Sequence, residues 1–582
     1  GRAPVLPAAE ARIFVDKCIA YLQEPRLAGR PDLAVLVACE GDKDAHLKGS
    51  EKLRAILMRN IPSVTCPRIY NALYPFDKKI ERKPTFAPMA SQVARGPFLL
   101  NYTGHSGAYE IGSVMSISHI DRLTFTSMPV TFFASCETTP VDAPFRGIGT
   151  KLFLHPSGPI ALVGTGRDVY LNNNQTLNEE FARQISLPDG PERLGDVWRT
   201  TINLSGKNSS VQRTNNFCYN FLGDPALPVR RPDRRAAVSF SSETGDAEST
   251  LDAPSLSPLM LNGRITLADG STDTAFDGNI TLSLYDAPLT TMRYAHASGD
   301  SIKPMTLDEK LLYETSAEVK NGLWSATITP PLSSREGRNR LTMLAYSDDG
   351  HIACGIDSTL TVRQPLTPIP TDTTGPQINL YLDSPDFING SETRPSPVVY
   401  VSIRDDESGI ATGSANIGDL PTAVLDSSTR LADIGPAMRF GTDGSAEVAY
   451  TLRNLPAGRH TLTLSARDVA GNTSRETLTF TVVDTMFSAI LSTDSTICRK
   501  SVELDLAGHP TSGLTSRLII RNMEGATVFT LDNASFPFAW DFRDSSGAAL
   551  PDGTYRASVL ITDGLRFGSS NEAGFTLIRP RY

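Results

Sequence analysis

A histidine and a cysteine follow two apolar segments that have the pattern of neighbouring strands. His105 comes just after the run Pro97–Tyr102, in a glycine-flanked turn, and Cys136 comes just after Val130–Ala134. Because the carboxyl ends of adjacent parallel strands meet at one edge of an open sheet, we expect the two side chains to face one another across a cleft. An imidazole beside a thiol can lower the thiol pKa, or take its proton and later return it to a leaving amine. The pair therefore predicts a cysteine nucleophile with a histidine base.

The immediate neighbours of this pair are compatible with acyl-transfer chemistry. Small residues on both sides would let a substrate backbone approach, and the backbone N–H groups of Ser106 and Cys136 could donate to a developing oxyanion. Spacing alone leaves an alternative open, because a cysteine after an apolar strand is usually buried filler and a single histidine is usually a structural hydrogen-bonding group. Cys39 and His46 form a rival pair at the carboxyl end of another strand.

The elements that must position these residues lie before about residue 230, where apolar strand-like runs alternate with helical segments. Strands that are apolar on both faces and separated by helices indicate a mostly parallel sheet covered on two sides. The predicted strands are Leu33–Cys39, Val64–Tyr70, Pro97–Tyr102, Val130–Ala134 and Pro159–Gly164, and the predicted helices are Leu47–Asn60, Phe145–Leu154, Asn174–Ile185 and Arg193–Leu204.

Beyond Pro228 the helical pattern disappears, and short alternating strands are separated by Asp-Gly, Asn-Gly and Pro-Asp-Gly turns. That pattern is typical of antiparallel sandwiches. An Arg/Pro-rich stretch at 228–235 and a Pro/Thr-rich run at 364–376 indicate domain boundaries. We therefore expect a multidomain chain with an α/β domain at 1–230 and three all-β sandwich modules, at 231–365, 372–484 and 485–582.

Length and composition exclude several classes of protein. A chain of 582 residues is too long for one hydrophobic core, and 40% apolar with 20% charged residues is a globular mixture. The net charge of −9 disfavours a nucleic-acid-binding protein. The longest apolar runs are of strand length, so no transmembrane helix is expected. The seven cysteines have no metal-ligand spacing, and the site is expected to work without a metal or other cofactor.

Two segments resemble the signature blocks of the gingipain-type cysteine peptidases, which are family C25 of the caspase-like group. These are Asn101–His105 and Phe132–Cys136, each an apolar strand ending in one member of the pair. The resemblance implies a caspase-like fold and favours His105 and Cys136 over the rival pair. Three further stretches are similar to this family: Gly1–Val5 leading into Phe14–Tyr21, Leu36–Asp42 with His46 and Glu51 beyond, and Asn220–Leu227.

The chain departs from this family in two places. The family usually has Gly directly after the histidine, whereas this chain has Ser106, so an oxyanion donor there must use backbone angles open to a residue with a Cβ. The family also has strands before the motif at Gly1–Val5, so we expect the N-terminal part of the sheet to lie upstream or in a separate chain. A central strand left unpaired would be an aggregation hazard.

A third group should orient His105, and the resemblance puts a carboxylate on the loop after Leu33–Cys39. Glu40, Asp42 and Asp44 lie on this loop, and Asp42 and Glu40 are the main candidates, although acidic residues before a helix often cap its N-terminus. The same loop, ending at His46, could also bind a metal ion.

Other polar residues lie on loops further along the chain. Arg167, Asp168 and Tyr170 follow the strand Pro159–Gly164 and could form a substrate-side wall that sets specificity, or could pair with each other. The segments at 405–410 and 467–472 resemble turn motifs of bacterial immunoglobulin-like modules, which are more often turn-formers than ligands of a structural calcium ion.

The whole arrangement is similar to the C-terminal signal peptidases of the bacterial type IX secretion system, which are sortase-like enzymes. The final module is similar to flagellar-hook-cap-like and secretion-signal domains. This resemblance implies an outer-membrane, cell-surface enzyme that removes C-terminal signal domains from cargo and attaches the cargo to anionic lipopolysaccharide. It also implies outer-membrane secretion proteins as partners and no nucleic acid. The alternatives are a gingipain-like degradative protease and a catalytically silent surface assembly module.

Overall fold

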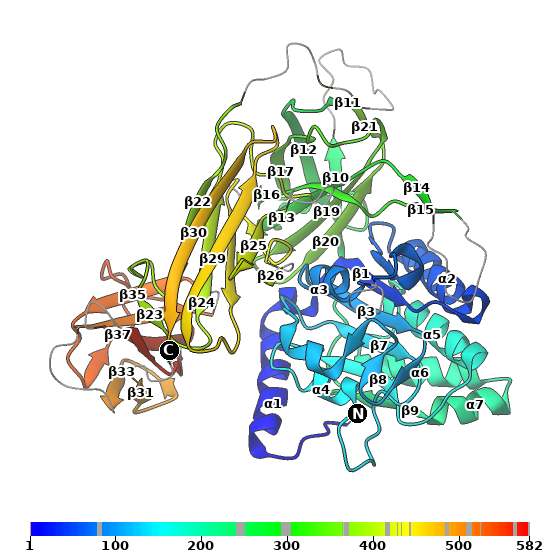
Figure 1. The fold of residues 1–582 in the computed structure, drawn as a ribbon, viewed down its shortest axis with the longest axis horizontal. Helices are drawn as coiled ribbons and strands as arrows, with labels where there is room; N and C mark the ends of the chain where they lie inside the picture. The colour runs from blue at the N-terminus through cyan, green and yellow to red at the C-terminus, as the bar shows by residue number, and fades with distance from the viewer. Residues whose placement is uncertain are drawn as a thin grey trace.

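A six-stranded sheet forms the centre of the N-terminal domain (Figure 1). The computed structural model describes residues 2–77, 84–239, 251–292, 304–363, 365, 372–413, 420–427, 429–431, 434–441, 444–483, 488–507, 515–523, 525–562 and 567–579. The strand order is β2-β1-β3-β7-β8-β9, and every neighbouring pair is parallel except β8 with β9. The strands are β1 (Arg30–Ala38), β2 (Arg68–Tyr70), β3 (Pro97–Thr103), β7 (Val130–Ala134), β8 (Ala161–Thr165) and β9 (Tyr219–Leu222).

Helices cover both faces of this sheet, because the inner strands are apolar on both sides. One face packs against α2, α5 and α6, and the other packs against α3 and α4. The helices are α1 (Ala8–Gln23), α2 (Ala45–Asn60), α3 (Phe86–Val93), α4 (Ile148–Phe153), α5 (Leu171–Ser186), α6 (Leu194–Gly206) and α7 (Ser210–Phe217). The predicted α/β domain with a mostly parallel sheet is thus what the structure contains.

Two outer strands form the edges of the described sheet. Every inner strand has a partner on each side, so no central strand is left unpaired. The edge strands are the short β2 and the antiparallel β9. Arg2 forms a parallel bridge with Leu222, so the first described residues lie along β9.

The module after the N-terminal domain is a closed barrel, so the sandwich predicted for 231–365 is wrong. β10 pairs with β12 on one side and in parallel with β20 on the other, which closes the sheet. Alternating apolar residues face the interior in barrels and sandwiches alike, so the pattern of single strands does not distinguish them. The barrel strands, in spatial order, are β10 (Arg234–Ser239), β12 (Leu259–Thr266), β17 (Leu323–Ile328), β16 (Leu311–Lys320), β13 (Gly278–Tyr285), β19 (Arg340–Ser347) and β20 (Ile352–Asp357).

Small sheets flank the barrel. One contains β11 (Leu251–Pro254), β21 (Leu360–Arg363) and β18 (Gly337–Arg338), and the other pairs β14 (Leu289–Met292) with β15 (Pro304–Leu307). The β14–β15 ribbon extends toward α2 of the N-terminal domain (Figure 1).

The third module has two sheets that share one core, as expected for a sandwich. The boundary expected near 484 lies outside the described residues. One sheet contains β22 (Gln377–Leu382), β24 (Val398–Arg404), β28 (Ala446–Thr451) and β27 (Arg439–Phe440). The other contains β23 (Glu392–Thr393), β30 (Thr473–Val482), β29 (Gly458–Arg467), β25 (Thr422–Leu425) and β26 (Thr429–Leu431).

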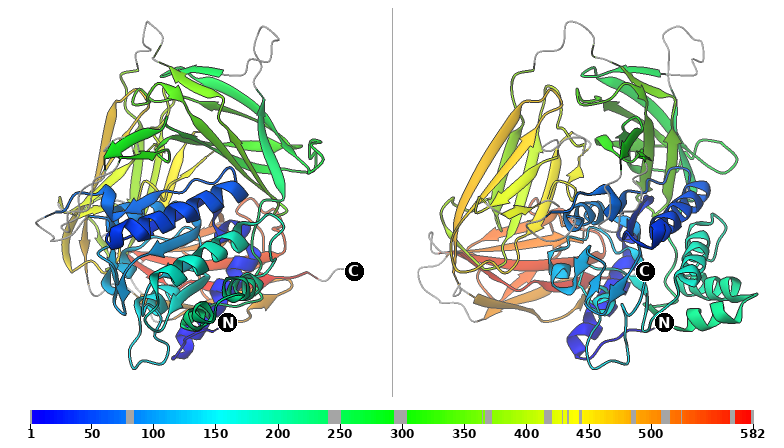
Figure 2. Two further views of the ribbon diagram at one scale, coloured as in Figure 1. Left: turned by 90° about the vertical axis from the view of Figure 1, so that its right-hand side faces the viewer. Right: turned by 45° about the vertical axis from the view of Figure 1, so that its right-hand side comes forward.

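The last module is also all-β, with an aromatic core around Trp540. Figure 2 shows it, in orange and red, beside the third module. Its strands are β31 (Ser488–Thr493), β32 (Ile497–Cys498), β33 (Val502–Ala507), β34 (Thr515–Asn522), β35 (Thr527–Asp532), β36 (Phe538–Trp540), β37 (Gly553–Thr562), β38 (Phe567–Ser570) and β39 (Ala573–Leu577). Among the described residues, no helix of the chain has the length and apolar character needed to span a bilayer.

Ion pairs around the buried Arg68 join the barrel to the N-terminal domain. Arg68, whose side chain is 2% exposed, contacts Asp308 at 3.0 Å and Glu309 at 2.6 Å. Arg54 contacts Asp308 at 2.6 Å. Removing one partner of a buried ion pair leaves a buried charge without compensation and costs about 3–5 kcal/mol. The two domains are therefore held in a defined orientation.

A second contact between these domains also includes the third module. Glu314 on β16 of the barrel contacts Arg30 at 2.9 Å and Arg95 at 3.4 Å, both in the N-terminal domain. The backbone N–H of Glu314 donates to Thr412 Oγ1 of the third module at 2.6 Å, and the Thr412 hydroxyl donates to the Glu314 carbonyl at 3.0 Å. One residue therefore connects three domains.

Candidate active site

The loops that follow β3 and β7 carry His105 and Cys136 to the same edge of the sheet. The register pairs Thr103 with Ala134, and the N–H of Gly104 donates to the Ala134 carbonyl at 3.4 Å. The hydroxyl of Ser106 donates to the main-chain carbonyl of Cys136. This edge is formed by the carboxyl ends of parallel strands, where ligand sites form in open α/β sheets.

The turn before His105 depends on close packing at Gly104. A Cβ on this residue would lie 2.5 Å from Cys39 Sγ and 2.5 Å from the Tyr102 hydroxyl oxygen. These distances are shorter than a Cβ normally approaches another atom, so the position favours glycine. The hydroxyl of Tyr102 donates to the His105 carbonyl, and the N–H of His105 donates to Cys39 Sγ at 3.3 Å. The main chain at His105 is thus held on both sides while its imidazole stays largely exposed.

A carboxylate holds the imidazole of His105. Nε2 of His105 lies 2.6 Å from Asp42 Oδ2, and Nε2 of His46 lies 3.0 Å from the same oxygen. The two imidazole rings meet edge to face with their centroids 5.0 Å apart. Partial burial alone would raise the pKa of Asp42, but contacts with His105 and His46 outweigh it and lower that pKa below its usual value. Asp42 is therefore ionised at neutral pH and binds both rings.

The loop that presents Asp42 has an unusual backbone. Asp42, Lys43 and Asp44 all have positive φ, between 47° and 64°, although none is glycine. Such angles cost of order 1 kcal/mol or more for each residue and persist where surrounding contacts fix them. Asp44 occupies the N-cap position of α2 without a side-chain cap hydrogen bond, and Asp42 binds histidines instead of the helix end. The capping explanation for the acidic residues of this loop is thus wrong at Asp42.

The thiol of Cys136 is half-buried next to the loop that follows β8. Its sulfur donates to the Val169 carbonyl at 3.8 Å. Burial raises the pKa of the Cys136 thiol, and the nearby carboxylates of Asp168 and Glu137 raise it further against the opposing effect of the Val169 contact. Glu137, directly after the cysteine, has a φ of 52°, so the backbone is also constrained here. The thiol is therefore protonated in the free protein and needs a base.

The rival pair does not have the properties of a nucleophile and base. Cys39 is 6% exposed, and burial raises the pKa of its thiol to about 11. A buried thiol of this kind is unreactive. His46 is 4% exposed and contacts Asp42, so it belongs to the site through the carboxylate. The sequence indicated His46 as a rival base, whereas in the structure it binds the Asp42 carboxylate. Its position four residues after Asp42, at the start of α2, is the sequence feature that could have indicated this contact.

The three polar residues expected on a substrate-side wall have different environments. Arg167 binds Asp142, with one nitrogen–oxygen distance of 3.0 Å, on the protein surface. Asp168 lies beside the Cys136 thiol, and Tyr170 is 68% exposed. Glu40, the other candidate for orienting His105, is half-buried two residues before Asp42. Asp168 is the residue of this group with a direct effect on the thiol.

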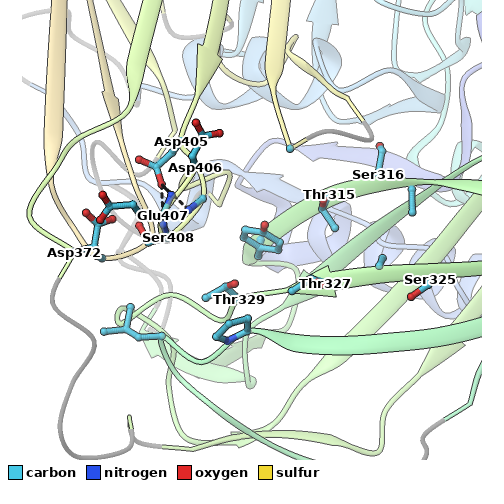
Figure 3. Close-up of a pocket in the computed structure, with 18 residues that line it drawn as sticks. Thr315, Ser316, Ser325, Thr327, Thr329, Asp372, Asp405, Asp406, Glu407 and Ser408 are labelled. Atoms are coloured by element: carbon cyan, nitrogen blue, oxygen red, sulfur yellow. Dashed lines mark hydrogen bonds between the residues drawn. The ribbon is translucent and has the colours of Figure 1, made fainter.

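A large cavity lies far along the chain from these residues, between the barrel and the third module. It has a volume of about 640 Å³. In Figure 3, Asp372, Asp405, Glu407 and Ser408 gather at one end, and hydroxyl residues of the barrel strands lie at the other. Asp405 accepts backbone N–H bonds from Ser408 and Gly409. Asp468 accepts such bonds within its own turn. Both aspartates thus have the turn-forming role that the sequence predicted.

The site and the sheet define a protein with a caspase-like α/β domain. Residues 1–230, which contain this domain, match the model of peptidase family C25. Comparison with curated protein sequences gave no match.

Among solved structures the chain is similar to latent dimeric PorU from Porphyromonas gingivalis, at 16% identity and a TM-score of 0.28, with 94% of this chain and 64% of that chain covered. The chain thus spans less than two thirds of the length of that protein. It is also similar to the Porphyromonas gingivalis complex of RgpB pro- and mature domains, at 16% identity and a TM-score of 0.33, with 60% of this chain and 73% of that chain covered. The structure of gingipain R (RgpB) gives 17% identity and a TM-score of 0.33, with 61% of this chain and 72% of that chain covered.

Proposed function

We propose that the chain is a cysteine endopeptidase in which Cys136 is the nucleophile, His105 is the general base and Asp42 orients His105. The observation that carries this proposal is the joining of the two loops at one sheet edge, with Asp42 bound to His105 Nε2. Because Nε2 is occupied by the carboxylate, Nδ1 is the nitrogen left to accept a proton from the thiol.

The first half of the reaction forms an acyl-enzyme. Nδ1 of His105 takes the S–H proton of Cys136, and the thiolate attacks the carbonyl carbon of the scissile peptide bond. The backbone N–H groups of Ser106 and Cys136 are the proposed donors to the resulting oxyanion. The C–N bond then breaks, His105 returns its proton to the leaving amine, and a thioester remains on Cys136.

The second half of the reaction releases the acyl group. His105 takes a proton from water or from an amine, and the new nucleophile attacks the thioester carbonyl. The C–S bond then breaks, and His105 returns the proton to the sulfur of Cys136. Water gives a free carboxyl group, and an amine gives a new amide bond, so hydrolysis and transpeptidation share one intermediate. Which reaction dominates depends on how the site admits each nucleophile.

The proposed substrate is cargo of the type IX secretion system that carries a C-terminal signal domain. The enzyme would remove that domain at the bacterial cell surface and pass the acyl chain to an amine of anionic lipopolysaccharide, with outer-membrane secretion proteins as partners. What supports this role is the family of the first domain together with the three β modules that follow it. A multidomain arrangement is suited to holding the folded tail of a substrate while the N-terminal domain cuts beside it.

The test compares the wild-type chain with Cys136→Ala on two substrates, a cargo protein with its signal domain and denatured casein. We expect release of one tail fragment from the cargo, no digestion of casein and no reaction by the variant. Mass spectrometry of the new cargo C-terminus, with an amine acceptor present, would show the mass of the acceptor added. Broad casein digestion would establish the degradative alternative, and equal behaviour of wild type and variant would establish a silent assembly module.

A further inference from the structure

The Asp42–His46–His105 cluster contains more ligating atoms than orientation of one histidine requires. One ligating atom from each of the three side chains lies within 4.8 Å of the other two. The carboxylate oxygen already lies 2.6 Å and 3.0 Å from the two imidazole nitrogens. Neighbouring ligand atoms of a tetrahedral zinc ion, with bonds near 2.1 Å, are about 3.4 Å apart. Widening each contact by less than about 1 Å would therefore accommodate such an ion.

We infer that Asp42, His46 and His105 form a binding site for Zn²⁺, with the fourth coordination position left to water. Two imidazoles and one carboxylate are the protein ligands of some catalytic zinc sites, which keep a water in the fourth position. Calcium and magnesium prefer all-oxygen ligand sets, so the two nitrogens favour a transition metal.

Burial and exposure divide the site into a fixed half and a movable half. The side chain of His46 is 5% exposed and is fixed on α2, whereas the side chains of Asp42 and His105 are 41% and 70% exposed. The metal can therefore enter from solvent, and the imidazole of His105 can shift to complete the coordination.

The surroundings of His46 limit the affinity. Within the described part of the chain, Nδ1 of His46 is buried without a hydrogen-bond partner. A zinc-bound histidine normally donates its other N–H to an acceptor, and loss of such a partner typically weakens binding by about 10–100-fold. We therefore expect reversible binding in the micromolar range, as for a regulatory ion, and weaker than binding at a structural site.

Zinc at this position would inhibit the enzyme. This consequence rests on the proposed function, whereas the existence of the zinc site does not depend on it. The metal would take Nε2 of His105 and the carboxylate of Asp42, and a metal-bound imidazole is a weaker base at its remaining nitrogen. The catalytic pair would be reversibly blocked without any contact between the metal and Cys136.

The experiment is a calorimetric titration of the full chain with ZnCl₂ at pH 7.5 in a buffer that does not chelate metals. We expect one site that is retained in Cys136→Ala and weakened at least tenfold in His46→Gln and in the exposed His105→Gln, each variant being checked for folding by circular dichroism. His351→Gln is the matched control, because His351 also contacts a carboxylate, that of Asp233. Among the residues that the structure describes, His351 belongs to no group of three potential metal ligands. This variant should change the affinity less than twofold.

Two results would overturn the site: unchanged binding in both His46→Gln and His105→Gln, or loss of binding in Cys136→Ala, which would place the metal on the thiol. Absence of stoichiometric binding to the wild-type chain would do the same. Binding is measured without peptidase activity, so an inactive wild-type chain that still binds zinc at this cluster would reject the proposed function and keep the metal site.

Discussion

Glu314 of the barrel and Arg30 of the N-terminal domain form a largely buried ion pair of 2.9 Å. Burial alone would raise the pKa of the Glu314 carboxyl, but Arg30 and Arg95 outweigh it and lower the pKa to about 2. A carboxylate whose folded-state pKa lies below its unfolded value stabilises the fold above the unfolded pKa, and that contribution is lost as the pH falls toward the folded pKa.

The first prediction concerns this ion pair and acid. Glu314→Gln should lower the melting temperature strongly at pH 7, because it leaves Arg30 and Arg95 buried without their carboxylate. The difference between wild type and variant should shrink between pH 4.5 and about pH 2, the window set by the two pKa values of Glu314. Calorimetric unfolding at several pH values measures this. Glu318→Gln, on an exposed part of the same strand, is the control and should change little at any pH; a difference for Glu314→Gln that stays constant with pH would contradict the assignment.

The second prediction separates the two carboxylates that sequence reasoning offered for orienting His105. Asp42→Asn should lower kcat by about 100-fold or more, because an amide cannot bind and stabilise the imidazolium as a carboxylate does. Glu40→Gln should lower kcat less than threefold. Steady-state kinetics with a peptide substrate provide the measurement. Equal losses in the two variants would mean that Asp42 has no special role.

The third prediction concerns the residue that replaces the glycine usual in the family. Ser106→Ala keeps the backbone N–H but removes the hydroxyl that donates to the Cys136 carbonyl. Since one hydrogen bond contributes about 0.5–1.5 kcal/mol, we expect kcat to fall by roughly 3–10-fold with little change in KM.

Ser113→Ala is the control for this loop, because its hydroxyl accepts from Asn71 and does not touch the nucleophile. It should leave kcat within twofold of wild type. If Ser106→Ala behaved like Ser113→Ala, the link between the two loops would be unimportant for the reaction.

The fourth prediction concerns the reactivity of the thiol. The Asp168 carboxylate contributes to the raised pKa of Cys136, so Asp168→Asn should lower that pKa and increase the thiolate fraction at neutral pH. The rate of iodoacetamide modification at Cys136, followed by peptide mass spectrometry, should therefore rise at a lower pH than in the wild type. Asp121→Asn, which removes an exposed carboxylate that binds Lys151, should leave the profile in place. A shift to higher pH after Asp168→Asn would reject this electrostatic explanation.

The inner sheet could be predicted from the sequence because its strands are apolar on both faces. β7 has the bounds expected for it, and β1, β3 and β8 differ from their expected bounds by a few residues. Two observed elements are shorter than predicted. The strand expected at Val64–Tyr70 is β2 at Arg68–Tyr70, and the helix expected at Phe145–Leu154 is α4 at Ile148–Phe153. Residues at the ends of elements lack the full hydrogen-bond pattern, so amino-acid type alone defines them poorly.

The barrel could not be predicted, because its closure depends on the parallel pairing of β10 with β20, which are far apart in the chain. The identity of the carboxylate beside His105 was beyond sequence reasoning for a different reason. Glu40 and Asp42 are both acidic and near the right strand. Asp42 lies in a run of three consecutive non-glycine residues with positive φ, a backbone path that residue types do not predict.

The joint at Glu314 also has a mechanical consequence. A pull on the third module would be transmitted through Thr412 to β16, and from β16 through the guanidinium groups of Arg30 and Arg95 to β1 and the end of α3. Tension applied to the third module would thus reach the first residue of β1, the strand whose other end leads into the Asp42 loop.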